Sequence, residues 1–153
     1  MTMREITQSD IAELSACLSA LADHHNAVSV NFKGCYPARP IADTLASFAA
    51  QLAGGTSRIA VIADAETVIG FCKTDMQNGF GNVDYLVVLP EYRGCGYGKM
   101  LMDWAMEQFR TNHVDQIEIR VVDGNPAMHF YEKYGFAVKS HILGITKETQ
   151  HET

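Results

Sequence analysis

The sequence of 153 residues lacks a long apolar run, a proline- or serine-rich linker, and an excess of positive charge. Without about 18 consecutive apolar residues it offers no membrane-spanning helix, so we expect no membrane partner. Lysine and arginine number 12 against 18 aspartates and glutamates, a net charge of −6. Proteins that bind nucleic acid present basic surfaces, so we expect no nucleic-acid partner. With neither linker nor repeat, we expect one domain over residues 1–153.

Cysteine is also scarce, and its four positions (17, 35, 72 and 95) form no C-x-x-C pair. Met1 to Glu5 show no signal-peptide pattern, so we expect a cytoplasmic protein with reduced thiols. His24 and His25 are adjacent, but neighbours on a helix face different ways, and no nearby carboxylate or cysteine pattern completes a site. We therefore expect no metal.

Hydrophobic residues make up 47% of the sequence, enough for a core, and their periodicity predicts two helices in the N-terminal third. The first is capped by Ser9, and the second ends at Gly54-Gly55. Their apolar positions are Ile11, Leu14, Leu18 and Leu21 in the first helix and Ile41, Leu45, Phe48 and Leu52 in the second.

Runs of β-prone residues predict strands at 3–6, 58–63, 67–74, 82–89, 116–122, 136–140 and 142–145. Helices are expected after the glycine-rich turn near residue 98 and between residues 126 and 134. The order β-α-α-β-β-β-α-β-α-β-β predicts a mixed α/β (α+β) fold, a mixed sheet with helices packed on it.

The most informative segment is Val88 to Lys99, which reads VLPEYRGCGYGK. A β-prone run ends in glycines at 94, 96 and 98, and a helical pattern follows at once. Such a turn points backbone N–H groups inward at a helix start, which favours binding of a phosphate group.

Two common phosphate loops fail on particular residues of this segment. The dinucleotide motif G-x-G-x-x-G would need glycine where the chain has Lys99. The nucleoside-triphosphate loop G-x-x-x-x-G-K-[ST] would need glycine in place of Arg93 and a hydroxyl residue in place of Met100.

A second block follows the strand predicted at 116–122. Asn125 is a good N-cap, and Pro126 suits the first helical position. Ala127, Phe130, Tyr131 and Tyr134 stand at helical spacing, and Gly135 supplies the C-terminal stop. This block predicts a short capped helix.

Arg93 to Gly98 resembles the [QR]-x-x-G-x-[GA] signature of the GCN5-related N-acetyltransferase (GNAT) family, and Asn125 to Phe136 resembles its second coenzyme A block. The resemblance covers residues 58–143 well and the N-terminal third in outline. It implies a mixed, mostly antiparallel sheet of six to seven strands with helices on both faces. It implies acetyl-CoA as co-substrate, bound by Leu86, Val87, Val88, Arg93, Gly94, Cys95, Gly96, Tyr97, Gly98, Lys99, Asn125, Met128, Tyr131 and Lys133. Cys95 receives no catalytic role.

Tyr131 has two readings. Acetyl transfer ends by expelling a thiolate, and the family places a tyrosine here to give the sulfur a proton or a hydrogen bond. By periodicity alone, Tyr131 is a core partner of Ala127 with its hydroxyl at the rim.

The acceptor amine must lose a proton before it attacks, since a lysine-type pKa lies near ~10.4. Family members often place a carboxylate for this on the strand before the loop, but the matching position here is Asn82, an amide. Asp84 lies on the same face by alternation and could act as base, directly or through water, or could be an ordinary solvated carboxylate. The resemblance also implies a bulged strand near Val87 or Val88, with a backbone N–H there for the oxyanion.

The segment 24–37 lies between the first two predicted helices, is poor in helix formers, and can cover the acceptor site as it does in the family. Our candidate acceptor contacts are His24, His25, Asn31, Tyr36, Asn82 and Asp84.

Together these features predict an acetyl-CoA-dependent N-acetyltransferase acting on a primary amine of a small molecule or peptide. A non-catalytic acyl-CoA sensor, an enzyme that uses a longer acyl group, and a homodimer all stay open.

Overall fold

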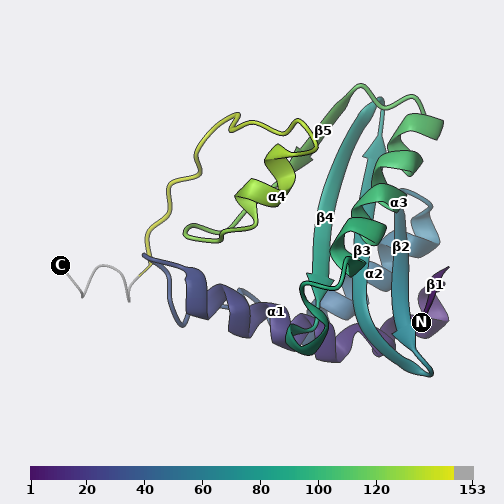
Figure 1. The fold of residues 1–153 in the computed structure, drawn as a ribbon, viewed down its shortest axis with the longest axis horizontal. Coiled ribbons are helices and arrows are strands. Elements are labelled where there is room, and N and C mark those ends of the chain that lie inside the picture. Colours follow the sequence, from purple (N-terminus) through teal and green to yellow (C-terminus); the bar gives the residue numbers. More distant parts are fainter. Residues whose placement is uncertain (147–153) are drawn as a thin grey trace. The chain divides into compact units, whose positions relative to one another are not determined.

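A five-stranded sheet forms the centre of the first of two compact units in the computed structural model, which describes residues 1–146 (Figure 1). This unit holds residues 1–22 and 37–120. The strands, in sheet order, are β1 (Thr2–Glu5), β2 (Ser57–Asp64), β3 (Thr67–Gln77), β4 (Phe80–Val88) and β5 (Gln116–Ile119). Neighbouring strands are antiparallel except β4 and β5, which are parallel.

Tight turns join β2, β3 and β4, as their sequences favour. The β2–β3 turn places Ala65 at φ 54°, and Asn78 and Gly79 in the β3–β4 turn have φ of 54° and 79°. Two successive positive φ values match the right-handed twist of a hairpin, which is why Asn-Gly is favoured there.

The helices of this unit begin and end largely where their sequences predict. They are the 3₁₀ helix η1 (Gln8–Leu14), the start of α1 (Ser15–Val28), α2 (Ile41–Gly54), the 3₁₀ turn η2 (Pro90–Tyr92) and α3 (Tyr97–Thr111). Gly55 ends α2 with φ 81°, as predicted. The prediction of Ser9 as first cap was wrong: Thr7 holds that position, and its backbone N–H donates to the Asp10 carboxylate.

Apolar side chains fill both faces of the sheet. Phe48 of α2 packs on one face beside Phe71 and Val87, with Leu14 and Cys17 in the same cluster. Helix α3 lies on the opposite face and buries Leu101, Met102, Ala105 and Phe109 (Figure 1). A Cβ on Gly81 would lie 2.6 Å from the Phe109 ring, so only glycine lets α3 approach β4 this closely. The predicted mixed sheet with helices on both faces is confirmed.

The predicted number of strands was wrong. Residues 136–140 and 142–145 form no strand within the described chain, and β5 ends at Ile119 rather than residue 122. A strand exists only where a neighbour completes its ladder, and β5 pairs over four residues with β4 alone. Residues Val138, Ile142 and Leu143 are instead 59%, 73% and 95% exposed.

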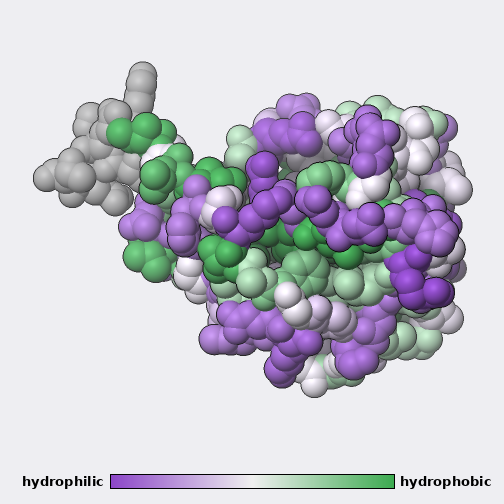
Figure 2. All heavy atoms as spheres, turned by 90° about the horizontal axis from the view of Figure 1, so that it is seen from above, coloured by the Kyte–Doolittle hydropathy of each residue, from purple (hydrophilic) through white to green (hydrophobic). Residues whose placement is uncertain are grey.

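Within the described chain, the second unit holds residues 23–36 and 121–146. It includes the last turns of α1 and the short helix α4 (Met128–Glu132). Hydrophobic surface lies beside the grey atoms in Figure 2. Near the end of the described chain, Ile142, Leu143 and Ile145 are exposed. The single domain over residues 1–153 stays a prediction.

Candidate active site

The glycine-rich loop connects β4 to α3 in the way its sequence predicts. The chain leaves β4 through η2, Arg93 is extended, and Gly94 and Gly96 take φ of 78° and 89°. Side chains other than glycine rarely adopt such values, so these two residues allow the loop to curl back into the helix. Gly96 occupies the N-cap position of α3.

The backbone N–H groups of this loop are available to a ligand. Within residues 1–146, none of those from Gly94 to Lys99 donates a hydrogen bond, and the first helical bond runs from Met100 N–H to the Gly96 carbonyl, at 3.1 Å. Unpaired N–H groups at a helix start favour an anion. The loop therefore fits the pyrophosphate of a coenzyme.

The two basic side chains of the loop have partners in the protein. The Arg93 Nε donates to the Val88 carbonyl at 3.1 Å, which ties the loop to the end of β4. The Lys99 ammonium lies 2.7 Å from Asp103, one helical turn on. Backbone groups are thus the main anion-binding feature of the loop. Cys95 is exposed and in contact with the Arg93 carbonyl.

Strand β4 has an open edge just before this loop. Its pairing with β5 stops at Val83 and Ile119, so the two strands separate beyond that point. The Leu89 N–H donates to the Ile69 carbonyl of β3. Because successive N–H groups of a strand point to opposite sides, the Val87 N–H also points to β3. The N–H groups of Leu86 and Val88 therefore lie on the open side of β4. The open edge can pair with an extended amide-containing arm.

The bulge of β4 is at Asp84, not at Val87 or Val88 as expected. Lys73 and Thr74 of β3 pair with Tyr85 and Val83, which leaves Asp84 as the extra residue. Bulges re-aim a side chain, and here the Asp84 carboxylate turns toward β3. The expectation failed because register is decided by both strands together.

The carboxylate of Asp84 binds a lysine that sequence analysis missed. The Lys73 ammonium is 2.7 Å from Asp84 Oδ2 and 2.6 Å from Asp75 Oδ1, and it is fully buried. Burial, with the nearby charge of Asp84, raises the pKa of the Tyr85 hydroxyl, and Arg39 opposes the shift. A lone lysine in the otherwise apolar run from Val68 was the available sequence signal.

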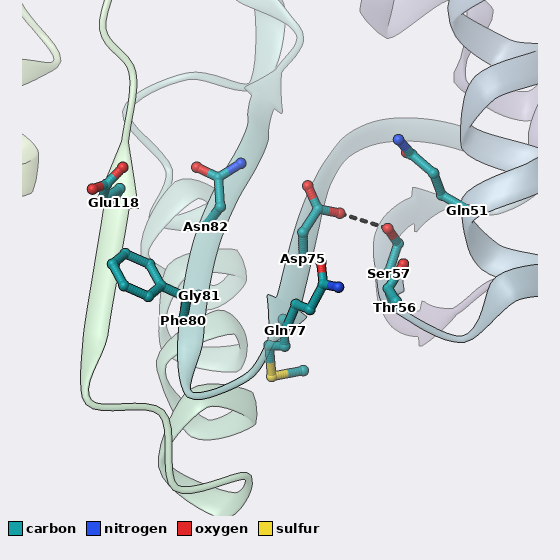
Figure 3. Close-up of a pocket in the computed structure, with 10 residues that line it drawn as sticks. Gln51, Thr56, Ser57, Asp75, Gln77, Phe80, Gly81, Asn82 and Glu118 are labelled. Atoms are coloured by element: carbon teal, nitrogen blue, oxygen red, sulfur yellow. Dashed lines mark hydrogen bonds between the residues drawn. The ribbon is translucent and has the colours of Figure 1, made fainter.

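Asn82 lies in a hollow of about 330 Å³ on the α2 side of the sheet (Figure 3). Ser57, Asp75, Asn82 and Glu118 stand in one row across it, because they are direct partners on β2, β3, β4 and β5. Ser57 donates to Asp75 at 2.5 Å, and Gln51 of α2 borders the hollow. Asn82 thus shares a polar row whose other members sequence analysis missed. Asp84 does not border the hollow.

In the second unit, the Asn125 block forms the predicted short helix, but Asn125 is not its N-cap as predicted, because Ala127 holds that position. The Asn125 side chain accepts the Ala127 N–H at 3.0 Å, although α4 begins at Met128 rather than Pro126. Helix α4 ends at Glu132 with Lys133 as its C-cap, not at Gly135 as predicted. Gly135 lies in the turn that follows, at φ 95°, and the Phe136 N–H donates back to the Tyr131 carbonyl. The remaining predicted coenzyme contacts, Met128, Tyr131 and Lys133, lie on or just after this helix.

The predicted acceptor residues of the second unit form their own cluster. His24 and His25 lie on α1, which runs to Val28, so the prediction of a helix-poor segment from residue 24 was wrong. The His25 ring packs edge-on against Tyr36 at 5.2 Å, and burial lowers the pKa of His25.

Asp123 organises this cluster, and sequence analysis missed it. Its carboxylate accepts hydrogen bonds from the Ser29 hydroxyl and from the N–H groups of Val30 and Asn31, at 2.7 to 2.9 Å. A Cβ on Gly124 would lie 2.2 Å from the Val28 carbonyl, so only glycine fits beside this contact. Asn31 thus has a structural contact through its backbone.

Comparison with known proteins identifies the family. An acetyltransferase (GNAT) domain model matches residues 55–138, more than half of the chain. The chain belongs to the GNAT acetyltransferase family. This match contains the open edge of β4 and the whole loop, while the predicted acceptor segment 24–37 precedes it.

A curated relative is the [ribosomal protein bS18]-alanine N-acetyltransferase of Haemophilus influenzae. It is 34% identical over 71 residues, which cover 45% of this chain and 47% of that protein. The chain thus matches about half of the relative's length, and the match does not extend over the whole protein.

Solved structures support the fold. The tetramutant BH1408 protein of Bacillus halodurans superimposes with a TM-score of 0.76 at 22% identity, over 95% of this chain and 99% of that one. A predicted acetyltransferase of Clostridium acetobutylicum, crystallised with acetyl-CoA, gives 0.75 at 17% identity over 95% of both chains. At such identities the likeness concerns the fold alone.

Two features are absent from residues 1–146. No group of three or more His, Cys, Asp or Glu side chains could hold a metal ion. No helix in this part of the GNAT chain is long and apolar enough to cross a membrane.

Proposed function

We propose that this GNAT protein is an acetyl-CoA-dependent N-acetyltransferase that transfers acetyl to a primary amine of a small molecule or peptide by direct attack on the thioester. The observation that carries the proposal is the loop from Gly94 to Lys99, whose free N–H groups directly follow the open edge of β4. Pyrophosphate binding at the loop and amide pairing along Leu86 and Val88 suit the two ends of a coenzyme A arm.

Bound acetyl-CoA supplies an acetyl thioester, and the chain supplies proton transfer and charge stabilisation. Asp84 takes a proton from the acceptor ammonium, directly or through water. The Val88 N–H, on the open side of β4, donates to the developing oxyanion. Tyr131 gives a proton or hydrogen bond to the departing sulfur.

The acceptor binds at the hollow beside β4. Gln51, Ser57, Asp75, Asn82 and Glu118 present amides, a hydroxyl and carboxylates there, and such groups suit a polar cation better than an apolar amine. The H. influenzae relative's name specifies an alanine of a ribosomal protein, so peptides with a free N-terminus belong in any acceptor panel. His24, His25, Asn31 and Tyr36 stay candidate acceptor contacts, and a homodimer stays a proposal.

The test is thiol release from acetyl-CoA, measured by mass spectrometry across polyamines, amino acids, aminoglycosides and peptides with free N-termini. We expect release that depends on one acceptor class. Micromolar acetyl-CoA binding without release by any amine would favour a sensor and contradict the proposal. Propionyl-CoA and succinyl-CoA, run in parallel, test the preference for acetyl over a longer acyl group.

A further inference from the structure

Lys73 is a charged residue in the middle of the sheet, with no solvent-exposed surface. It lies on β3 between Ile59 of β2 and Tyr85 of β4, and its ammonium sits 5.1 Å from the centre of the Phe48 ring on α2. Lysine is almost never fully buried unless it is paired, because its charge loses hydration.

The ammonium bridges two strands. Its partners are Asp75 Oδ1 on β3, at 2.6 Å, and Asp84 Oδ2 on β4, at 2.7 Å. The two aspartate side chains are 30% and 32% exposed, so each reaches solvent while the lysine does not. Within the described chain, the other oxygen of each carboxylate makes no hydrogen bond to the protein.

Each carboxylate belongs to a different feature of the proposed site. Asp84 is the extra residue of the β4 bulge, at the point where β4 and β5 begin to separate. Asp75 lies in the polar row of the hollow and also accepts the Ser57 hydroxyl. Lys73 is thus the direct link between the bulge and the hollow.

We propose that Lys73 is a positioning residue for acetyl transfer: it fixes the Asp84 carboxylate at the bulge and joins it to Asp75 in the acceptor hollow. The proposal rests on the function proposed above. Two carboxylates around one ammonium leave a net charge of −1, which attracts a cationic acceptor. Each carboxylate keeps one oxygen for that acceptor or its water.

Stability alone gives little reason for a lysine at this position. Replacing a buried ion pair by well-packed apolar side chains is often neutral or stabilising. A lysine that does not act on the reacting groups would also leave the pH dependence of turnover unaffected. The ionisable groups around it, which any titration would include, are Asp75, Asp84, Tyr85, Arg39 and, in the hollow, Glu118.

Asp75→Asn is the first test variant, because it removes one carboxylate and keeps the lysine. The ammonium then acts on Asp84 alone and holds it ionised to lower pH. The acid limb is the low-pH part of the pH profile, in which kcat and kcat/KM fall as the base takes up a proton. We expect this limb to move down by about one pH unit. The acceptor KM should rise as well, since Asp75 lines the hollow.

Lys73→Met should move the same limb in the opposite direction. Without the ammonium the two carboxylates repel each other, and a proton is retained by the pair to higher pH. We expect an upward shift of about one unit or more, and Lys73→Arg should restore most of the wild-type profile. If Lys73→Met does not fold, as judged by circular dichroism, Asp75→Asn alone decides the question.

Matched surface variants control for net charge. Glu107→Gln and Arg110→Met break an exposed ion pair on α3 and change the charge by the same amounts. We expect both to leave the acid limb unmoved. Normal wild-type turnover with an unmoved limb in the Lys73 and Asp75 variants would overturn the Lys73 inference alone. If the wild-type protein releases no thiol from acetyl-CoA with any amine, both the proposed function and the Lys73 inference are overturned.

Discussion

Tyr131 is the residue on which the chemical proposal depends most directly. Its ring packs edge-on against Phe130 and Phe136, with centroid distances of 5.4 and 6.3 Å. Aromatic packing of this kind holds a ring in one orientation. The same packing suits a core residue, so the role of the hydroxyl has to be measured.

Tyr131→Phe keeps the ring and removes the hydroxyl. We expect kcat to fall by about a hundredfold, in the range of general-acid effects, with the Kd for acetyl-CoA within about twofold. Stopped-flow thiol release and calorimetric binding give the two numbers. Tyr134→Phe removes a hydroxyl from the next turn and should change kcat less than about twofold. Equal effects of the two variants would show that Tyr131 is not the acid.

Lys73 shows how far one residue depends on its neighbours. In sequence it is a single charge within an apolar strand. In the fold it meets Asp84 only because β4 carries a bulge there. The alternation of side chains along a strand predicted that Asp84 and Asn82 share one face of the sheet. It could not predict the cross-strand partner of either residue, because pairing register is a property of two strands.

Among the elements, the loop between β4 and α3 was the easiest to predict. Its conformation follows from two glycines at positive φ and a helix start, both encoded within a few residues. A short helix after Asn125 was predictable for the same reason, but its caps were not: they are Ala127 and Lys133 rather than Asn125 and Gly135. The start of helix η1 was harder to predict. The choice between Ser9 and Thr7 as its cap depends on the hydrogen bond from the Thr7 N–H to the Asp10 carboxylate.

Gly94→Ala tests the loop as an element. Alanine at φ 78° costs about 1–2 kcal/mol, so we expect the Kd for acetyl-CoA to rise about tenfold as the loop relaxes. Gly79→Ala is the matched control, since Gly79 has φ 79° and open space around it but lies in the β3–β4 turn. It should lower stability and leave the Kd unchanged. A similar Kd for both variants and the wild type would argue against the loop as the phosphate site.

At the scale of the whole molecule, the pH dependence of stability has an identifiable contribution from Asp123. Hydrogen bonds from Ser29, Asn31 and Val30 lower the pKa of Asp123 from the ordinary aspartate value in the folded state. A carboxylate with a lowered folded pKa stabilises the protein above its unfolded pKa. That contribution is lost as the pH falls through the folded value.

Asp123→Asn should therefore lower the free energy of unfolding at pH 7 and progressively less as the pH falls below about 4. Urea denaturation at pH 7, 5 and 3 measures the difference from the wild type. Asp115→Asn, an unrelated exposed carboxylate, serves as the control and should show no such trend. A difference that stays constant across this range would show that the Asp123 charge does not contribute.

By itself, the sequence determined helices α2 and α3, the β2–β3 hairpin, the loop conformation and the family. Each of these depends on local backbone preferences or on a short periodicity. The tertiary structure alone decided that Ser57, Asp75, Asn82 and Glu118 form one row, that Asp84 is the bulged residue, and that Lys73 lies between two carboxylates. Strand register brings these distant residues together, and no local pattern encodes it.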